Sequence, residues 1–112
     1  MKDDRLYLIH IRDCIARIEQ YTAAGKSDFQ HDTKTQDAVL RNLQVLAESS
    51  QRLSEDLKAR HSEVPWRNMA AFRNVLVHGY LGINIAGVWE IVERNLPPLK
   101  SQIAKILDTL AL

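Results

Sequence analysis

The stretch DRLYLIHIRDCIARIEQYTAA (Asp4–Ala24) decides the fold class. Its apolar residues Leu8, Ile11, Ile15 and Ile18 are spaced by three and four, so they share one face of a helix while the charged residues lie off that face. A half-buried strand would alternate apolar and polar residues, and no segment of this chain does so over a strand's length. We therefore predict a helix over Asp4–Ala24.

The same spacing predicts a second long helix over Lys34–Arg60. Thr33 or Thr35 is available as its starting cap, and Pro65 stops it. Gly25 stands where a C-terminal cap of the first helix is expected. The residues 26–34 that follow are polar apart from Phe29 and predict a loop, either irregular or with one helical turn. The apolar face of the second helix is Val39, Leu43, Leu46, Ser50, Leu53 and Leu57.

Two further helices follow Pro65. The third begins at Pro65, a residue favoured in a first turn, and ends before Gly79. The fourth starts at Asn84, a good cap residue, and Pro97-Pro98 should kink or break it. The pattern predicts an all-α protein: an up-and-down bundle of four main helices, with a short third helix and a proline-kinked last one, in a single domain over residues 1–112.

Composition excludes several classes of protein. The chain has 112 residues, 46% apolar and 26% charged, which is typical of one foldable domain and not of a disordered chain. Its net charge of +1 excludes a general polycationic coat for nucleic acid, so any site for a polyanion must be local. The single cysteine, the lack of a leader and the lack of a long apolar run predict a cytoplasmic protein that does not enter a membrane.

Extra apolar positions lie beside the main faces, namely Tyr7, Cys14 and Tyr21 on the first helix and Leu40 and Ala47 on the second. They widen the apolar surface beyond what one small bundle needs. We therefore expect a homo-oligomer, although a broad core within one chain would explain the same pattern.

The residues best suited to chemistry stand in RNVLVHGY (Arg73–Tyr80), at the end of the third helix. Cleavage of RNA by its own 2′-hydroxyl needs a group that moves protons near neutral pH and a cation on the phosphate. His78 and Arg73 supply both without a metal or another cofactor. The segment from Lys58 to His78 carries four cations against one carboxylate, which predicts a local basic patch around the site.

The motif alone also fits a structural role. Arg73 would then pair with a carboxylate, His78 would cap the helix as a cation, and Tyr80 would pack in the core. Other candidates are weaker. The remaining histidines lack metal-ligand spacing, and Cys14 is predicted to be a small buried hydrophobic residue. Trp66 and Trp89 stand at helical positions, where tryptophan packs in the core more often than it stacks on bases. Those histidines are His10, His31 and His61.

Nearly the whole chain resembles the HepT-type HEPN ribonuclease toxins, which are paired with a minimal nucleotidyltransferase antitoxin. Arg73 to Tyr80 matches the family's Arg-x4-His-x-Tyr motif, and further matches follow one another in order along the chain. These are RNLQVLAESSQRLS (residues 41–54), Pro65-Trp66-Arg67, HGYLGIN (residues 78–84) and VWEIVERNLPPLK (residues 88–100).

The resemblance implies an endoribonuclease toxin of a type VII-like pair. Two copies of the motif would face each other in a homodimer and cleave tRNA or mRNA without metal. Arg73 and His78 would be the catalytic pair, with Asn74 orienting them or contacting RNA. Tyr80 would be the residue to which the antitoxin transfers AMP, which blocks the cleft by bulk and charge.

One departure from the family is Asn84, where an acidic residue is frequent, and asparagine caps a helix nearly as well. A rival hypothesis keeps the motif for an interface only. The chain would then be a catalytically inactive helical module that binds a nucleotidyltransferase.

Overall fold

The computed structural model describes residues 3–79 and 82–110, and within these ranges the chain forms helices and turns with no strand. This confirms the all-α prediction. The elements are α1 (Asp4–Tyr21), α2 (Lys26–His31), α3 (Thr33–Gln51), α4 (Glu55–Arg60), α5 (Trp66–His78), α6 (Ile85–Glu90), the π-helix η2 (Ile91–Asn95) and α7 (Leu96–Leu110). None of these helices is both long and apolar enough to cross a bilayer.

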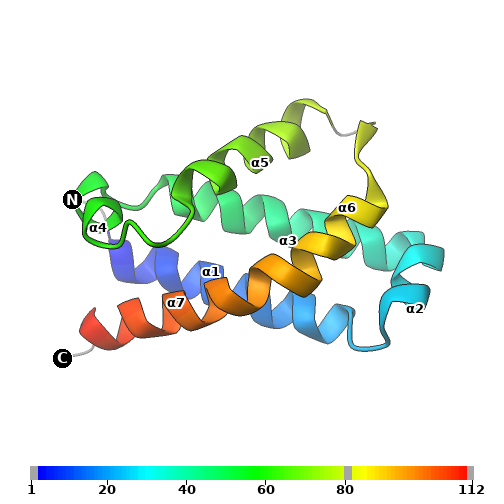
Figure 1. Cartoon of the computed structure of the whole chain (residues 1–112), viewed down its shortest axis with the longest axis horizontal. Coiled ribbons are helices and arrows are strands. Elements are labelled where there is room, and N and C mark those ends of the chain that lie inside the picture. Colours follow the sequence, from blue (N-terminus) through cyan, green and yellow to red (C-terminus); the bar gives the residue numbers. More distant parts are fainter. Residues whose placement is uncertain (1–2, 80–81, 111–112) are drawn as a thin grey trace.

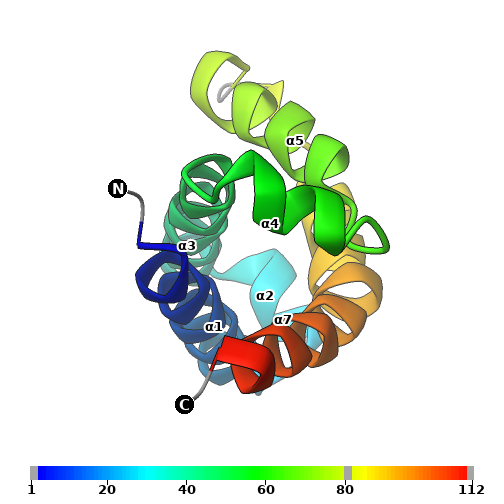
Figure 2. The same cartoon turned by 90° about the vertical axis from the view of Figure 1, so that its left-hand side faces the viewer.

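Three long helices, α1, α3 and α7, make the body of the molecule (Figure 1). α1 packs against α3 on one side and α7 on the other, while α5 lies on α3. Figure 2 shows α5 leaning outward at the side of the bundle that lies farthest from α1. The helix with the RNVLVHGY motif is therefore held mainly by one neighbour.

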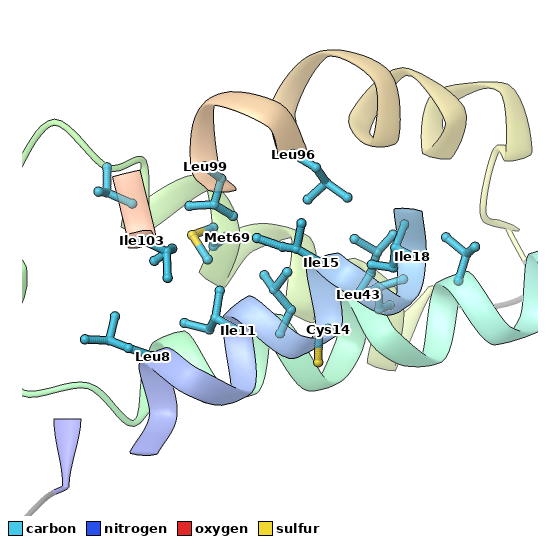
Figure 3. Close-up of a cluster of buried hydrophobic side chains, with 14 of the residues drawn as sticks. Leu8, Ile11, Cys14, Ile15, Ile18, Leu43, Met69, Leu96, Leu99 and Ile103 are labelled. Atoms are coloured by element: carbon cyan, nitrogen blue, oxygen red, sulfur yellow. The ribbon is translucent and has the colours of Figure 1, made fainter. Parts of the chain in front are cut away.

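The core is built from the apolar face predicted for the first helix and its counterparts (Figure 3). Leu8, Ile11, Ile15 and Ile18 are all buried to 1% exposure or less. Burial of one such side chain stabilises the fold by roughly 1.5–3 kcal/mol. Of the extra apolar positions, Cys14, Leu40 and Ala47 are also buried in this core, whereas Tyr21 is 40% exposed.

The single helix predicted over Lys34–Arg60 is wrong, because it breaks at Arg52–Ser54 into α3 and α4. Asp4 of α1 stabilises the break: its carboxylate accepts hydrogen bonds from the Ser54 backbone N–H at 2.8 Å and from the Ser54 hydroxyl at 2.6 Å. The same hydroxyl accepts from the Leu57 N–H at 3.2 Å and so caps α4. The turn keeps Leu53 and Leu57 buried, as the apolar pattern predicted.

Two smaller features around the first loop also differ from the predictions. α3 is capped by Asp32, whose carboxylate accepts from the Lys34 N–H and the Thr35 hydroxyl, rather than by Thr33 or Thr35. The loop predicted before it contains the helix α2, since Phe29 is buried against Trp89 with ring centroids 5.4 Å apart.

The ends of α1 and α2 are set by Thr22 and Gly25. α1 ends at Tyr21, three residues before the predicted Ala24, and the Thr22 hydroxyl donates to the Ile18 carbonyl at 2.7 Å. Gly25 precedes α2 with φ +98°, in the left-handed region that favours glycine.

The last helix is remodelled before its prolines. Asn84 caps α6 by accepting from the Gly87 N–H at 3.3 Å, as predicted. Pro97 and Pro98 have no N–H to donate to the preceding turn, and that turn is the π-helix η2, in which the Leu96 N–H reaches the Ile91 carbonyl. The helical path therefore continues through the proline pair without ending.

Candidate functional site

Helix α5 positions the motif, and both of its ends follow the sequence signals. The helix begins at Trp66, one residue after the predicted start, with Pro65 as its N-cap, and the Met69 N–H donates to the Pro65 carbonyl at 3.1 Å. Gly79 ends it by donating its N–H to the Val75 carbonyl at 2.8 Å. A Cβ at Gly79 would lie 3.1 Å from that carbonyl oxygen, so the close approach favours glycine there.

Arg73 and Asn74 are in contact, as the guanidinium Nη1 donates to the Asn74 side-chain oxygen at 3.4 Å. Arg73 is half-buried, and Asn74 and His78 are exposed. Among the described residues no hydrogen bond joins His78 to Arg73 or Asn74, consistent with an angle of about 140° between Arg73 and His78 on an ideal helix. Tyr80 lies outside the described residues.

The Arg73 guanidinium retains unused hydrogen-bonding capacity. Its Nε is buried and has no acceptor in the part of the chain that the structure describes. A buried donor without an acceptor costs roughly 1–3 kcal/mol, so a side-chain rotation that lets an anion accept from it recovers that cost. The carboxylate pairing considered for Arg73 is not formed among these residues, and its side chain remains able to bind a phosphate.

A pocket of about 150 Å³ lies between α3 and α5 beside the motif, lined by Leu76 of α5 and by Asp37, Leu40, Arg41 and Gln44 of α3. These α3 residues were not among the candidate site residues predicted from the sequence. Their polar members are spaced by four and three and therefore share one face of α3, which is the signal that could have drawn attention to them. Arg41 brings a second guanidinium to the side of α3 that meets the motif helix.

The basic patch expected from Lys58 to His78 is weaker than the sequence count suggests. Lys58 pairs with Glu55 at 3.6 Å and Arg60 with Asp56 at 3.1 Å, using carboxylates that lie just before the counted segment. Arg67 carries no ion pair among the described residues. The cations left over are therefore Arg67 at the start of α5 and Arg73 near its end.

The other histidines have ordinary partners or none. His31 contacts the Ser27 carbonyl at 2.8 Å, His61 lies 3.6 Å from Glu63, and His10 is exposed with its ring edge against Tyr7. Within residues 3–79 and 82–110, no three His, Cys, Asp or Glu side chains come together in a way that could hold a metal ion.

Cys14 and the two tryptophans take structural positions. Burial raises the pKa of the Cys14 thiol, so it is a core residue and a poor nucleophile. Trp89 is buried, whereas Trp66 is half-buried and donates its indole N–H to the His61 carbonyl at 3.0 Å.

Comparison with known proteins places this arrangement in a family. The family model described as "Ribonuclease HepT-like" matches residues 11–106. The chain is 39% identical over 101 residues to "Probable ribonuclease HepT" of Thermococcus cleftensis, covering 89% of this chain and 92% of that protein. It is 34% identical over 109 residues to "Putative RNase TTE0752" of Caldanaerobacter subterraneus subsp. tengcongensis, covering 96% and 97%.

A longer protein also matches. "Gamma-glutamylcyclotransferase and putative RNase MJ0434" of Methanocaldococcus jannaschii is 34% identical over 110 residues, which cover 97% of this chain but 50% of that protein. The chain therefore spans half the length of this relative. No solved structure matches the chain significantly.

Proposed function

The chain belongs to the HepT-like ribonuclease family, and from this premise we propose that it is a metal-independent endoribonuclease whose catalytic groups are Arg73 and His78. The observation that carries the proposal is the half-buried Arg73, whose Nε has no acceptor among the described residues and which lies five residues before the exposed His78. The carboxamide of Asn74 holds the guanidinium from one side.

In the proposed mechanism, the 2′-hydroxyl of the substrate attacks the adjacent phosphorus and the 5′-oxygen leaves. His78 takes or returns a proton, and Arg73 stabilises the extra negative charge on the phosphate in the transition state. The bond between the phosphorus and the 5′-oxygen breaks, and the leaving 5′-oxygen keeps the electron pair and takes up a proton. The products are a 2′,3′-cyclic phosphate and a 5′-hydroxyl.

We propose that the working form is a homodimer with two motifs in one cleft. The reaction needs one group that removes a proton and another that supplies one, and each chain brings one histidine in the motif. On α5, Val75 and Val77 are 49% and 38% exposed on either side of Leu76. Such apolar side chains on the surface of the motif helix suit a contact with a second copy.

Regulation by a partner completes the proposal. The chain would be the toxin of a type VII-like pair, held inactive when a minimal nucleotidyltransferase transfers AMP to the Tyr80 hydroxyl. The modification places a bulky anion two residues after His78, where it would repel the RNA phosphate. Expression without the partner should then arrest growth, and Arg73→Ala should relieve the arrest.

The test is cleavage of bulk cellular RNA and tRNA by the purified protein in EDTA, with the product ends mapped. We expect His78→Ala to lower the rate at least 100-fold and Arg73→Ala by about 100- to 1,000-fold, with cyclic-phosphate ends from the unmodified protein. His10→Ala and Arg5→Ala change exposed residues of the same types on α1 and should cleave normally.

Intact mass first establishes that the preparation lacks AMP. Cleavage that survives His78→Ala in a folded preparation contradicts the assignment of His78. No cleavage by folded, unmodified protein contradicts nuclease activity and favours the inactive module that binds a nucleotidyltransferase.

A further inference from the structure

A second cavity lies beside the first half of the motif helix, nearer to its N-terminus than the pocket lined by Leu76. It is a groove of about 160 Å³ between α5 and the η2–α7 segment, with α3 beneath it. Figure 3 shows Leu96 and Leu99 projecting from α7 on the side where Met69 of α5 lies, and all three line this groove. We call it the α5–α7 groove.

The α5–α7 groove has an apolar floor and a polar lip. Its floor includes Leu43, Leu46, Met69 and Leu99, which are at most 8% exposed. Its lip carries the exposed carboxamides of Asn68 on α5 and Asn95 at the end of η2. Apolar walls with a few polar groups at the opening are the usual anatomy of a small-ligand site.

The groove is large enough for one ring. An apolar protein cavity of about 150 Å³ holds one benzene molecule. A groove of about 160 Å³ therefore accommodates a single six-membered ring. Each carboxamide offers both an N–H donor and a carbonyl acceptor, which is what the edge of a pyrimidine base requires.

A basic recess continues from the same lip. It has a volume of about 360 Å³ and is lined in part by Lys58, Ser62, Trp66 and Arg67, and it shares Pro65 and Asn68 with the groove. Arg67 has no ion pair among the described residues, whereas Lys58 pairs with Glu55 at 3.6 Å. The two cavities together join an apolar slot to a cationic end, which matches a base attached to a phosphate.

The π-turn shapes the groove on its far wall. Ile91 and Asn95, the first and last residues of η2, both line it. π-turns inside helices occur frequently at functional sites, and this one brings a side-chain amide to the opening.

We propose that the α5–α7 groove binds the base of one unstacked pyrimidine nucleotide, with the neighbouring phosphate at Arg67. The inference rests on the proposed function, because the nucleotide would belong to a single strand of the substrate RNA. Asn68 is ten residues before His78, about 15 Å along the helix axis. A strand of a few nucleotides spans that length, so the groove would anchor RNA beside the cleavage site.

The test measures binding separately from cleavage. Fluorescein-labelled hexauridine is titrated in EDTA and low salt with His78→Ala protein, and then with the same protein carrying Asn68→Phe, which plugs the groove from an exposed position. We expect about tenfold weaker binding with Asn68→Phe, which corresponds to about 1.4 kcal/mol. Ala104→Phe, an exposed residue of α7 outside both cavities, is the matched control and should bind normally.

Two further measurements identify the base and the phosphate. Six hexamers are compared, each lacking the base at a different position. At one position, removal of the base should weaken binding to the His78→Ala protein about tenfold. The same removal should leave binding to the protein that also carries Asn68→Phe unchanged. Arg67→Gln should lower the slope of log binding constant against log salt by about 0.7, as expected for one phosphate contact on a single strand. Free UMP that competes with the hexamer, and fails to do so with Asn68→Phe, shows that one nucleotide suffices.

Equal binding by Asn68→Phe and the parent overturns the inference, as does an equal effect of every abasic position. A change of oligomeric state on Asn68→Phe also overturns it, since the groove would then be covered by a second copy. Because the readout is binding, these results are separate from the cleavage assay. Wild-type protein that binds hexauridine through the groove but cuts no RNA contradicts the nuclease proposal alone.

Discussion

Replacing Asp4 by alanine removes both acceptors that hold the start of α4 against α1. The Asp4 carboxylate accepts from the Ser54 N–H at 2.8 Å and from the Ser54 hydroxyl at 2.6 Å, and both bonds are partly buried. The backbone N–H cannot find another partner without opening the turn, because it precedes the first residue of α4.

The magnitude follows from these two bonds. A hydrogen bond to a charged group contributes about 1.5–3 kcal/mol, and two that share one partly exposed carboxylate should together contribute about 3 kcal/mol. For a domain of this size the loss corresponds to a decrease in Tm of ~12 °C. Urea unfolding at pH 7, followed by circular dichroism, measures the free energy of unfolding directly.

Asp3 provides the matched control. It is the neighbouring carboxylate and caps α1 through one exposed bond, to the Leu6 N–H at 3.1 Å. Asp3→Ala should cost only about 1 kcal/mol. If Asp4→Ala costs no more than Asp3→Ala, the bridge to Ser54 does not stabilise the fold and the account of the helix break is wrong.

Three further predictions concern stability and reactivity. Ile15→Ala empties a core position that is 1% exposed and should lower the free energy of unfolding by about 2–5 kcal/mol in urea titration; a cost below 1 kcal/mol would mean that the site is not packed as described. Burial raises the pKa of the Cys14 thiol, so iodoacetamide at pH 8 should modify it slowly in folded protein and rapidly in urea, and equal rates would contradict its burial. The hydrogen bond from Thr35 holds the pKa of Asp32 below its usual 3.8, so the stabilisation is present above that pH and is lost as pH falls through the folded-state value. The stability difference between wild type and Asp32→Ala should therefore shrink between pH 6 and pH 2, and a constant difference would argue against the cap.

Features with local causes could be predicted from the sequence. The apolar spacing of α1, the cap at Asn84 and the limits of α5 at Pro65 and Gly79 depend on residues within a turn or two. The motif residues Arg73 and Asn74 were likewise proposed from their own segment, and their side chains share a hydrogen bond.

Features with distant causes could not be predicted. The break at Ser54 depends on Asp4, fifty residues earlier, and the heptad spacing of Leu53 and Leu57 continues through it. α2 depends on Phe29 meeting Trp89, sixty residues later in the chain. The α3 wall of the pocket beside the motif likewise follows from how α5 lies on α3, which spacing along one helix does not encode.

The π-turn η2 lets one nearly continuous helical path take part in two different packing arrangements. Before the turn, α6 packs on α2, and after it α7 packs on α1. A π-turn is geometrically a one-residue insertion in an α-helix, so its presence sets the rotational phase between these two faces. Deletion of one residue within Ile91–Asn95 would regularise the helix and turn Trp89 away from Phe29 while α7 kept its place. In evolutionary terms, the insertion or deletion of a single residue at this point would change which neighbour a whole helical face packs against. The sequence on either side would remain the same.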